Sequence, residues 1–245
     1  RQTVEAELAD LTGMPELKKM LSDVRKQALY VERGGNPKAL ARSFNLVLTG
    51  NPGTGKSTAA RIVARYLHAY GVLPSETVVE RNALLLKGQY VGQSAPRVAE
   101  AVADAMGGVL FIDEAYALAG NDGYGTEVVR TLLTELENNR TRFVCILAGY
   151  DEKMGHLMAM DPGLQRRFPT TLRLSNYTPA QLALIAEGVA CRSGFQLDSE
   201  VSVGELGQHI GQRHSGLIAS HNGGLAVQLV EAAIGRLMVR VVDEE

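Results

Sequence analysis

The chain carries GNPGTGKS at Gly50–Ser57. This stretch fits the G-x-x-x-x-G-K-[ST] pattern of a phosphate-binding loop, whose glycines let the backbone approach phosphate oxygens. The N–H groups of such a loop and the dipole of the following helix favour oxyanions. Lys56 is expected to reach the β and γ phosphates of ATP, and the Ser57 hydroxyl to ligate Mg²⁺. The residues expected to bind the nucleotide here are Gly50, Asn51, Pro52, Gly53, Thr54, Gly55, Lys56, Ser57 and Thr58.

Apolar runs of strand length alternate with amphipathic segments of helical length on both sides of this loop. The expected strands are Phe44–Thr49, Thr77–Glu80, Val109–Asp113, Phe143–Leu147 and Thr171–Leu174. The expected helices between them include Ala59–Tyr70, Ala95–Met106 and Thr126–Asn138. Alternation of this kind, with nearly continuous apolar strands, is typical of an α/β fold whose parallel sheet is covered by helices.

The pattern changes in the last part of the chain, where no further strand is indicated. Thr178 and Pro179 fit a helix N-cap and the first residue of the helix, and apolar residues then recur with helical spacing. A loop rich in Gly, Ser and His is expected at Gly211–Gly224. We therefore predict a P-loop α/β nucleotide-binding domain over residues 1–176 and a small all-helical lid domain over residues 177–245.

A buried strand ends in two adjacent carboxylates, in the stretch VLFIDE at Val109–Glu114. Asp113 is expected to hold Mg²⁺, directly or through water, and Glu114 to orient and deprotonate the attacking water. The alternative is a strand that simply ends in solvated acids. The phosphate loop elsewhere in the same chain favours the catalytic interpretation.

The composition narrows the classes of function. The 25 basic and 27 acidic residues give a net charge of −2, which disfavours a nucleic-acid partner. No apolar run reaches the roughly 18 residues that span a membrane, and no signal-peptide pattern opens the chain. We expect a soluble intracellular protein, in the cytoplasm or an organelle stroma, without a membrane partner. Because the chain opens on Arg1 rather than Met, we expect it to be a piece of a longer protein.

The chain resembles the CbbX/CfxQ group of AAA+ ATPases in four segments, GNPGTGKS, GGVLFIDEAYAL, ILAGY and DPGLQRRF. That group includes red-type Rubisco activase, the sporulation stage V protein K type and ATPases of type VII secretion. The resemblance runs from about Leu8 to Val242. It implies an ATPase that converts ATP to ADP and phosphate, assembles into a ring (a hexamer in the family) and remodels a protein client.

The resemblance assigns roles to residues outside the phosphate loop and the acidic pair. Leu11, Thr12 and Gly13 lie in DLTGM, which resembles the segment that covers the adenine, although an ordinary turn is the alternative. Tyr90 resembles the pore-loop aromatic that grips a polypeptide, and a core tyrosine is the alternative. The stretch NDGYG at Asn121–Gly125 matches a second pore-facing loop more weakly.

LQRRF, at Leu164–Phe168, resembles the stretch whose arginines act as fingers in the family. Arg166 and Arg167 would then neutralise charge on the γ-phosphoryl group of a neighbouring subunit. A finger supplied in this way implies a closed ring of heterologous contacts. A solvated basic pair is the alternative.

Two positions depart from the AAA+ pattern. Tyr150 follows the fourth strand where many members place Asn or Thr, and because the CbbX-like group shares this AGY ending, Tyr150 is a candidate sensor of the attacking water. HNGGLAV, at His221–Val227, replaces the family's G-N-A-R-x-x-R run and lacks both arginines. This loss puts the coupling of nucleotide to lid movement in doubt. It leaves open a second function, a structural or regulatory nucleotide-binding subunit with little hydrolysis.

Overall fold

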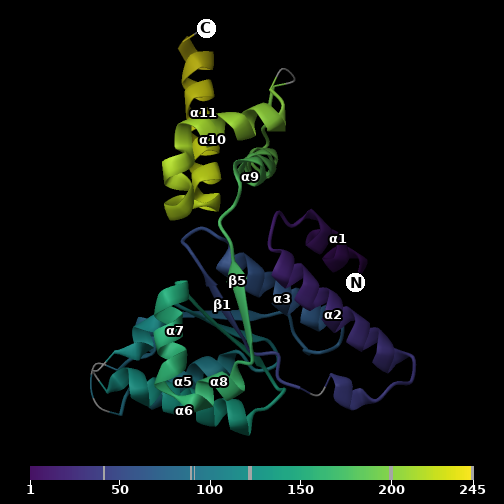
Figure 1. Cartoon of the computed structure of the whole chain (residues 1–245), viewed down its shortest axis with the longest axis vertical. Helices are drawn as coiled ribbons and strands as arrows, with labels where there is room; N and C mark the ends of the chain where they lie inside the picture. The colour runs from purple at the N-terminus through teal and green to yellow at the C-terminus, as the bar shows by residue number, and fades with distance from the viewer. Residues whose placement is uncertain (41, 89, 91, 121–122, 199–200, 244–245) are drawn as a thin grey trace. The chain divides into compact units, whose positions relative to one another are not determined.

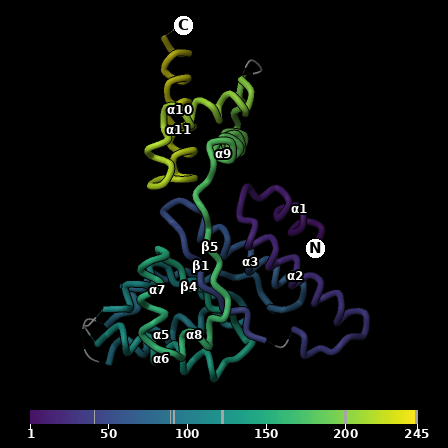
Figure 2. Tube along the Cα trace, in the orientation of Figure 1, coloured from purple at the N-terminus to yellow at the C-terminus, as the bar shows by residue number. Residues whose placement is uncertain are grey.

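The computed structural model shown in Figures 1 and 2 describes residues 1–40, 42–88, 90, 92–120, 123–198 and 201–243. The chain divides into two compact units, Arg1–Gly50 with Lys56–Leu174, and Asn51–Gly55 with Ser175–Glu245. The loop that carries the phosphate-binding pattern is therefore grouped with the C-terminal part of the chain. The predicted domain boundary between residues 176 and 177 stays a prediction.

The first unit contains a five-stranded sheet of order β2-β3-β4-β1-β5, in which every neighbouring pair is parallel. The strands are β1 (Leu46–Gly50), β2 (Val78–Asn82), β3 (Val109–Asp113), β4 (Val144–Gly149) and β5 (Thr170–Leu174). Each lies within two residues of its predicted bounds. The predicted α/β fold class is confirmed, and the near-complete burial of β1, β3 and β4 is what a parallel sheet covered by helices requires.

Helices lie on either side of this sheet (Figure 1). The helices of the first unit are α1 (Gln2–Asp10), α2 (Pro15–Glu32), η1 (Pro37–Ala39), α3 (Lys56–Ala69), α4 (Ala83–Leu86), α5 (Ser94–Asp104), η2 (Ala115–Ala119), α6 (Tyr124–Asn138), α7 (Asp151–Met160) and α8 (Pro162–Arg167). The helix following β1 begins at Lys56, earlier than the predicted Ala59, so the whole first turn directly follows the glycine-rich loop.

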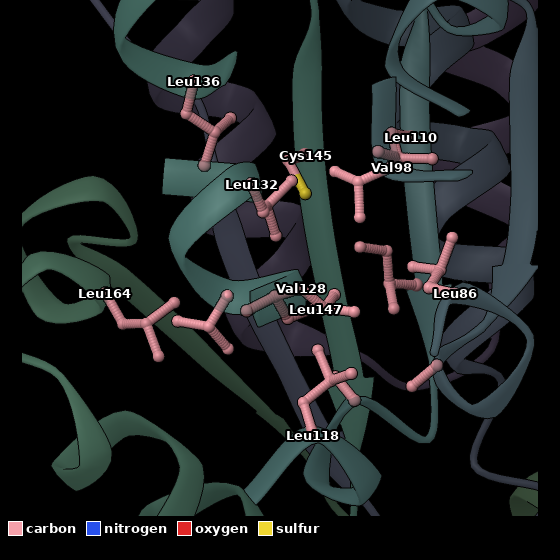
Figure 3. Packing of buried hydrophobic residues seen from close by; sticks show 14 of the residues in the cluster. Leu86, Val98, Leu110, Leu118, Val128, Leu132, Leu136, Cys145, Leu147 and Leu164 are labelled. Carbon is pink, nitrogen blue, oxygen red and sulfur yellow. The ribbon is translucent and has the colours of Figure 1, made fainter. Parts of the chain in front are cut away.

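One large cluster of buried apolar side chains fixes α5 and α6 against the sheet (Figure 3). Val98 of α5 and Leu132 of α6 point towards Cys145 of β4, which is fully buried. Leu110 of β3 and Leu147 of β4 continue the same cluster. This packing holds the carboxyl ends of β3 and β4 in place, and the polar residues discussed below follow those ends.

The second unit contains α9 (Pro179–Arg192), α10 (Val203–His221) and α11 (Gly223–Asp243). The predicted start of α9 is confirmed: the Thr178 side chain accepts a hydrogen bond from the Gln181 N–H, and the Gln181 side chain bonds back to the Thr178 N–H at 2.9 Å. Within the described part of the chain, no helix is long and apolar enough to cross a membrane.

The loop predicted at Gly211–Gly224 is wrong, because α10 continues to His221 and only one residue, Asn222, separates it from α11. Two glycines of α10 allow close packing, and one of them, Gly211, lies in the segment predicted as a loop. A Cβ on Gly207 would lie 3.3 Å from the Cα of Ala180, and one on Gly211 would lie 3.3 Å from the ring of Pro179. Glycine at these positions therefore lets α10 approach the start of α9.

Candidate nucleotide-binding site

The phosphate-loop pattern lies between the carboxyl end of β1 and the amino end of α3. Gly53 and Gly55 have φ angles of 70° and 89°, in the left-handed region that favours glycine. A Cβ on Gly53 would also lie 2.1 Å from the carbonyl oxygen of His221, within the second unit. Both glycines are therefore required by the backbone, as expected for a loop of this type.

Lys56 is the first residue of α3, and its Nζ donates to the Gly50 carbonyl at 2.9 Å. Burial lowers the pKa of the Lys56 ammonium, and the carboxylate of Asp113 acts in the opposite direction. The fold thus brings the cation of the loop near the carboxylate that ends β3. The sequence analysis predicted both residues for one site, and the structure brings them together.

Asp113 and Glu114 are adjacent in sequence but differ in backbone conformation. Asp113 ends β3, and its Oδ1 accepts the N–H of Glu114 at 2.8 Å. Glu114 has a φ of 51°, which is uncommon for a residue with a side chain and is found more often at functional sites. The two carboxylates therefore have different partners: that of Asp113 accepts a backbone N–H, and that of Glu114 accepts side-chain donors.

The Glu114 carboxylate is held by two donors that the sequence analysis missed. Asn82 Nδ2 donates to Oε2 at 2.9 Å, and the Tyr116 hydroxyl donates to Oε1 at 3.1 Å. These hydrogen bonds, first from Asn82 and then from Tyr116, lower the pKa of the Glu114 carboxyl. Burial and the bond to Glu114 raise the pKa of Tyr116 to about 12. Glu114 is therefore held as a carboxylate in a fixed orientation.

Tyr150 follows β4 and contacts Tyr116, one of the two donors to Glu114. Its ring stacks on that of Tyr116, with centroids 5.3 Å apart. Lys56 Nζ lies 5.6 Å from the Tyr150 ring centroid, and Lys153 Nζ of α7 lies 4.7 Å from that of Tyr116. The positive charge of Lys153 also helps to lower the pKa of Glu114, after the two hydrogen bonds. Lys153 is a third residue that the sequence analysis missed.

In the second unit, the backbone of the phosphate loop is bonded to the junction of α10 and α11. Asn222 is fully buried, and its Nδ2 donates to the Pro52 carbonyl at 3.0 Å while its Oδ1 accepts the Tyr177 N–H at 3.0 Å. The Gly223 N–H donates to the Gly53 carbonyl at 3.0 Å. These bonds hold the backbone at Pro52 and Gly53, in a loop of the type whose N–H groups receive an oxyanion.

The comparisons with known proteins agree with this geometry. A family model described as "ATPase family associated with various cellular activities (AAA)" matches residues 46–176. The chain is 35% identical over 197 residues to Protein CfxQ homolog of Cyanidium caldarium. This alignment covers 78% of this chain and 68% of that protein. The chain belongs to the AAA family of ATPases.

Two further relatives place the chain beside the sporulation and secretion members of this AAA family. It is 33% identical over 201 residues to Stage V sporulation protein K of Bacillus subtilis, covering 80% of this chain and 62% of that protein. It is 36% identical over 242 residues to ESX-1 secretion system protein EccA1 of Mycobacterium tuberculosis, covering 94% of this chain and 42% of that protein. The chain thus spans less than two thirds of either relative. The predicted kinship with the CfxQ and stage V protein K group is confirmed.

The segment predicted to cover the adenine in an AAA site links α1 to α2. Leu11, Thr12 and Gly13 are half-buried there, and Gly13 turns the chain with a φ of 72°. The next residue, Met14, is also left-handed at 54° and is buried. The segment is thus a tight, anchored turn, and its role towards adenine stays a prediction.

The predicted pore-loop residue Tyr90 is 70% exposed. That exposure contradicts the alternative of a core tyrosine. In the second, weaker pore-loop match at Asn121–Gly125, residues Asn121 and Asp122 lie outside the described residues. The role of both segments towards a client stays a prediction.

The two predicted finger arginines of this AAA chain end α8 in different environments. Arg166 is exposed, whereas Arg167 is half-buried and forms an ion pair with Glu137 of α6. Both precede β5, whose first residue, Thr170, pairs with Leu46 at the amino end of β1. Lys56 follows the carboxyl end of β1. Within one chain, the arginines and the loop lysine are therefore separated by the length of β1, roughly 15 Å at about 3.3 Å per residue.

Proposed function

We propose that this chain binds ATP with Mg²⁺ at Gly50–Ser57 and hydrolyses the ATP to ADP and phosphate. The observation that carries the proposal is a series of contacts that follows the carboxyl ends of β3 and β4: Lys56 Nζ lies 5.6 Å from the Tyr150 ring, which stacks on Tyr116, the donor to Glu114. The donors present fit Mg²⁺, because the Ser57 hydroxyl and the Asp113 carboxylate are the oxygen ligands that this ion prefers. The metal would supply neutralisation of negative charge on the phosphates.

Glu114 is the residue best placed to act on the attacking water. Its lowered pKa keeps it ionised near neutral pH, so it accepts a hydrogen bond from water and orients the water for attack. Asn82 and Tyr116 restrict its orientation. Lys56 would neutralise charge on the β and γ phosphates, and Tyr150 would contribute to the position of the water.

We further propose that the ATPase works as a ring oligomer, a hexamer by its resemblance to the family. Arg166 and Arg167 lie at the amino edge of the sheet and Lys56 at its carboxyl edge, which supports an arginine finger supplied by a second copy. The exposed Tyr90 would contact a protein client. Two kinds of client fit this proposal. The resemblance to red-type activases suggests Rubisco, and the relative named as a secretion-system protein suggests a secreted protein.

A second candidate function is a structural or regulatory nucleotide-binding subunit with little hydrolysis. Both carboxylate oxygens of Glu114 are already bonded, which weakens it as a base. HNGGLAV at His221–Val227 offers no arginine to the nucleotide. A subunit of this kind would use ATP to hold an assembly together.

Steady-state ATPase assays across a range of protein concentrations separate the two functions. For the proposed ring ATPase, the rate per chain rises with concentration because the site is completed by a second copy, and Glu114→Gln abolishes it. Glu100→Gln on α5 removes the same charge from an exposed position and serves as the control. If the wild-type ATPase rate equals that of the Glu114→Gln protein at every concentration, the structural or regulatory subunit is favoured.

A further inference from the structure

The first unit contains a polar cavity. Its volume is about 260 Å³, and the residues relevant here are Arg42, Asn45, Arg140, Thr141, Arg166 and Arg167. They precede β1, β4 and β5, so the cavity lies at the amino edge of the sheet. The candidate nucleotide site uses the carboxyl edge of the same sheet.

Positive charge in this cavity exceeds the negative charge paired with it. Glu137 forms ion pairs with Arg140 and Arg167 and thereby serves two of the four lining arginines. Arg42 donates to the neutral side chain of Gln27 at 3.2 Å, and its guanidinium lies over the Phe44 ring. Guanidinium groups gathered in this way repel one another, and an anion among them would relieve that repulsion.

Arg167 also presents a buried donor that lacks an acceptor. Its Nε is buried, and no described residue accepts a hydrogen bond from it. Buried N–H groups are nearly always bonded, so Arg167 Nε is one of the few exceptions among the described residues. The ion pair with Glu137 uses Nη2, so it does not satisfy the Nε donor of Arg167.

The backbone beside these arginines is strained. Thr141, between α6 and β4, has a φ of 62°, a left-handed conformation that is rare for a β-branched residue. Strain of this kind persists where the surroundings enforce it and concentrates at ligand sites. At this position it fixes the path of the chain between Arg140 and Phe143, which both line the cavity.

We propose that this cavity binds a small phosphate-bearing anion, either inorganic phosphate or a phosphomonoester. Guanidinium groups bind phosphate oxygens in pairs and with short, charge-assisted hydrogen bonds. The volume of about 260 Å³ is below the roughly 300–1,000 Å³ of sites for larger ligands, which favours a small one. The half-buried Arg167 then belongs to this site, and the exposed Arg166 is the better candidate for the finger.

The test is a calorimetric titration of the full chain carrying Lys56→Ala, which removes the cation of the phosphate loop. Inorganic phosphate and glycerol 3-phosphate are titrated separately, and we expect saturable binding of one anion per chain. Adding Arg140→Gln should weaken this binding by about tenfold or more. The Arg140 side chain is 65% exposed, so the substitution should leave the fold intact.

Arg61→Gln in the same Lys56→Ala background is the matched control, because Arg61 is an exposed arginine paired with Glu80 elsewhere on the unit. Binding should be unchanged in this variant. Binding of either anion supports the site. The anion that binds more tightly shows whether the site prefers free phosphate or a phosphate ester. Binding that disappears with Lys56→Ala alone would assign the anion to the phosphate loop and overturn the proposal. Equal weakening by Arg61→Gln and Arg140→Gln would also overturn it. None of these outcomes depends on ATP hydrolysis.

Discussion

At the scale of single residues, Glu114 is defined by neighbours that come from other elements. Asn82 ends β2 and lies opposite Asp113 in the register of β2 with β3. This register places the Asn82 amide within hydrogen-bonding distance of the glutamate that follows Asp113. The orientation and ionisation of Glu114 therefore depend on strand pairing as well as on the motif that contains it.

Asn82→Ala should shift the pH dependence of ATP hydrolysis. The Asn82 amide bonds the ionised form of Glu114 and lowers its pKa, so removal of the amide raises that pKa towards its ordinary value. The acid limb of the profile of kcat against pH should move to higher pH, with little change well above neutrality. Asn36→Ala, which affects only the cap of η1, is the control. An acid limb that stays in place would show that Asn82 does not tune the catalytic carboxylate.

The sequence was sufficient to predict the site residues that lie within a recognisable motif. It was insufficient to predict the site residues that lie outside one. Lys56, Asp113 and Glu114 are recognisable because each lies at or after the end of a strand in a known local pattern. Asn82 and Lys153 carry no such local signal. Their positions follow from strand register and helix placement, which depend on contacts between distant parts of the chain.

At the scale of elements, the strands were predictable and one helix was not. Long apolar runs identify buried parallel strands directly. Part of α10 has the glycine-rich composition of a loop, yet two of its glycines pack closely against α9: Gly207 approaches the Ala180 backbone and Gly211 the ring of Pro179. Local composition does not distinguish a glycine in a loop from a glycine that lets two helices pack closely. The distinction depends on which residues of the other helix lie opposite the glycine.

Asn222, together with Gly223, joins the α10–α11 junction to the phosphate loop within the second unit. Asn222→Ala removes its amide and leaves the Pro52 carbonyl and the Tyr177 N–H without their partner, so the free energy of unfolding should fall by about 2 kcal/mol or more. Asn222→Gly, which tolerates the left-handed φ of 45°, should be destabilised nearly as much. Urea denaturation measures both. A stable Asn222→Gly protein would assign the effect of Asn222→Ala to backbone strain instead.

The start of α11 carries a further prediction on nucleotide selectivity. Gly224 and Val227 stand where the family has arginines, and neither offers a side-chain donor. A charge-assisted bond to the γ-phosphate is worth about 1.5–3 kcal/mol, so we expect this chain to prefer ATP over ADP by less than tenfold. Val227→Arg should raise that preference, and paired titrations with ATP and ADP measure it. Strong preference in the wild type, unchanged by the substitution, would contradict the assignment of this position.

At the scale of the whole molecule, a working site should combine two copies of the chain. Arg166→Ala and Lys56→Ala proteins should each be nearly inactive. Their mixture should regain part of the ATPase activity, because in mixed rings an intact phosphate loop meets an intact finger. Arg173→Ala, an exposed arginine of β5 paired with Asp151, controls for the loss of charge. Co-assembly without recovered activity would place all catalytic groups within one copy.

Four motifs identified the family of the molecule from its sequence, whereas the client and the number of subunits carry no comparable signal. The residues that would contact a client or a neighbouring copy, such as Tyr90 and Arg166, are exposed in the single chain. Their roles depend on surfaces that other molecules supply.

Calorimetric titration of ATP with Mg²⁺ into wild type and Lys56→Ala measures whether Gly50–Ser57 binds ATP. Lys38→Ala, in the short helix η1, is the control for loss of a lysine. We predict saturable binding to wild type and Lys38→Ala, and affinity reduced at least about tenfold in Lys56→Ala, because the loop loses the ammonium that bonds the phosphates. Equal ATP affinity in wild type and Lys56→Ala would contradict the account.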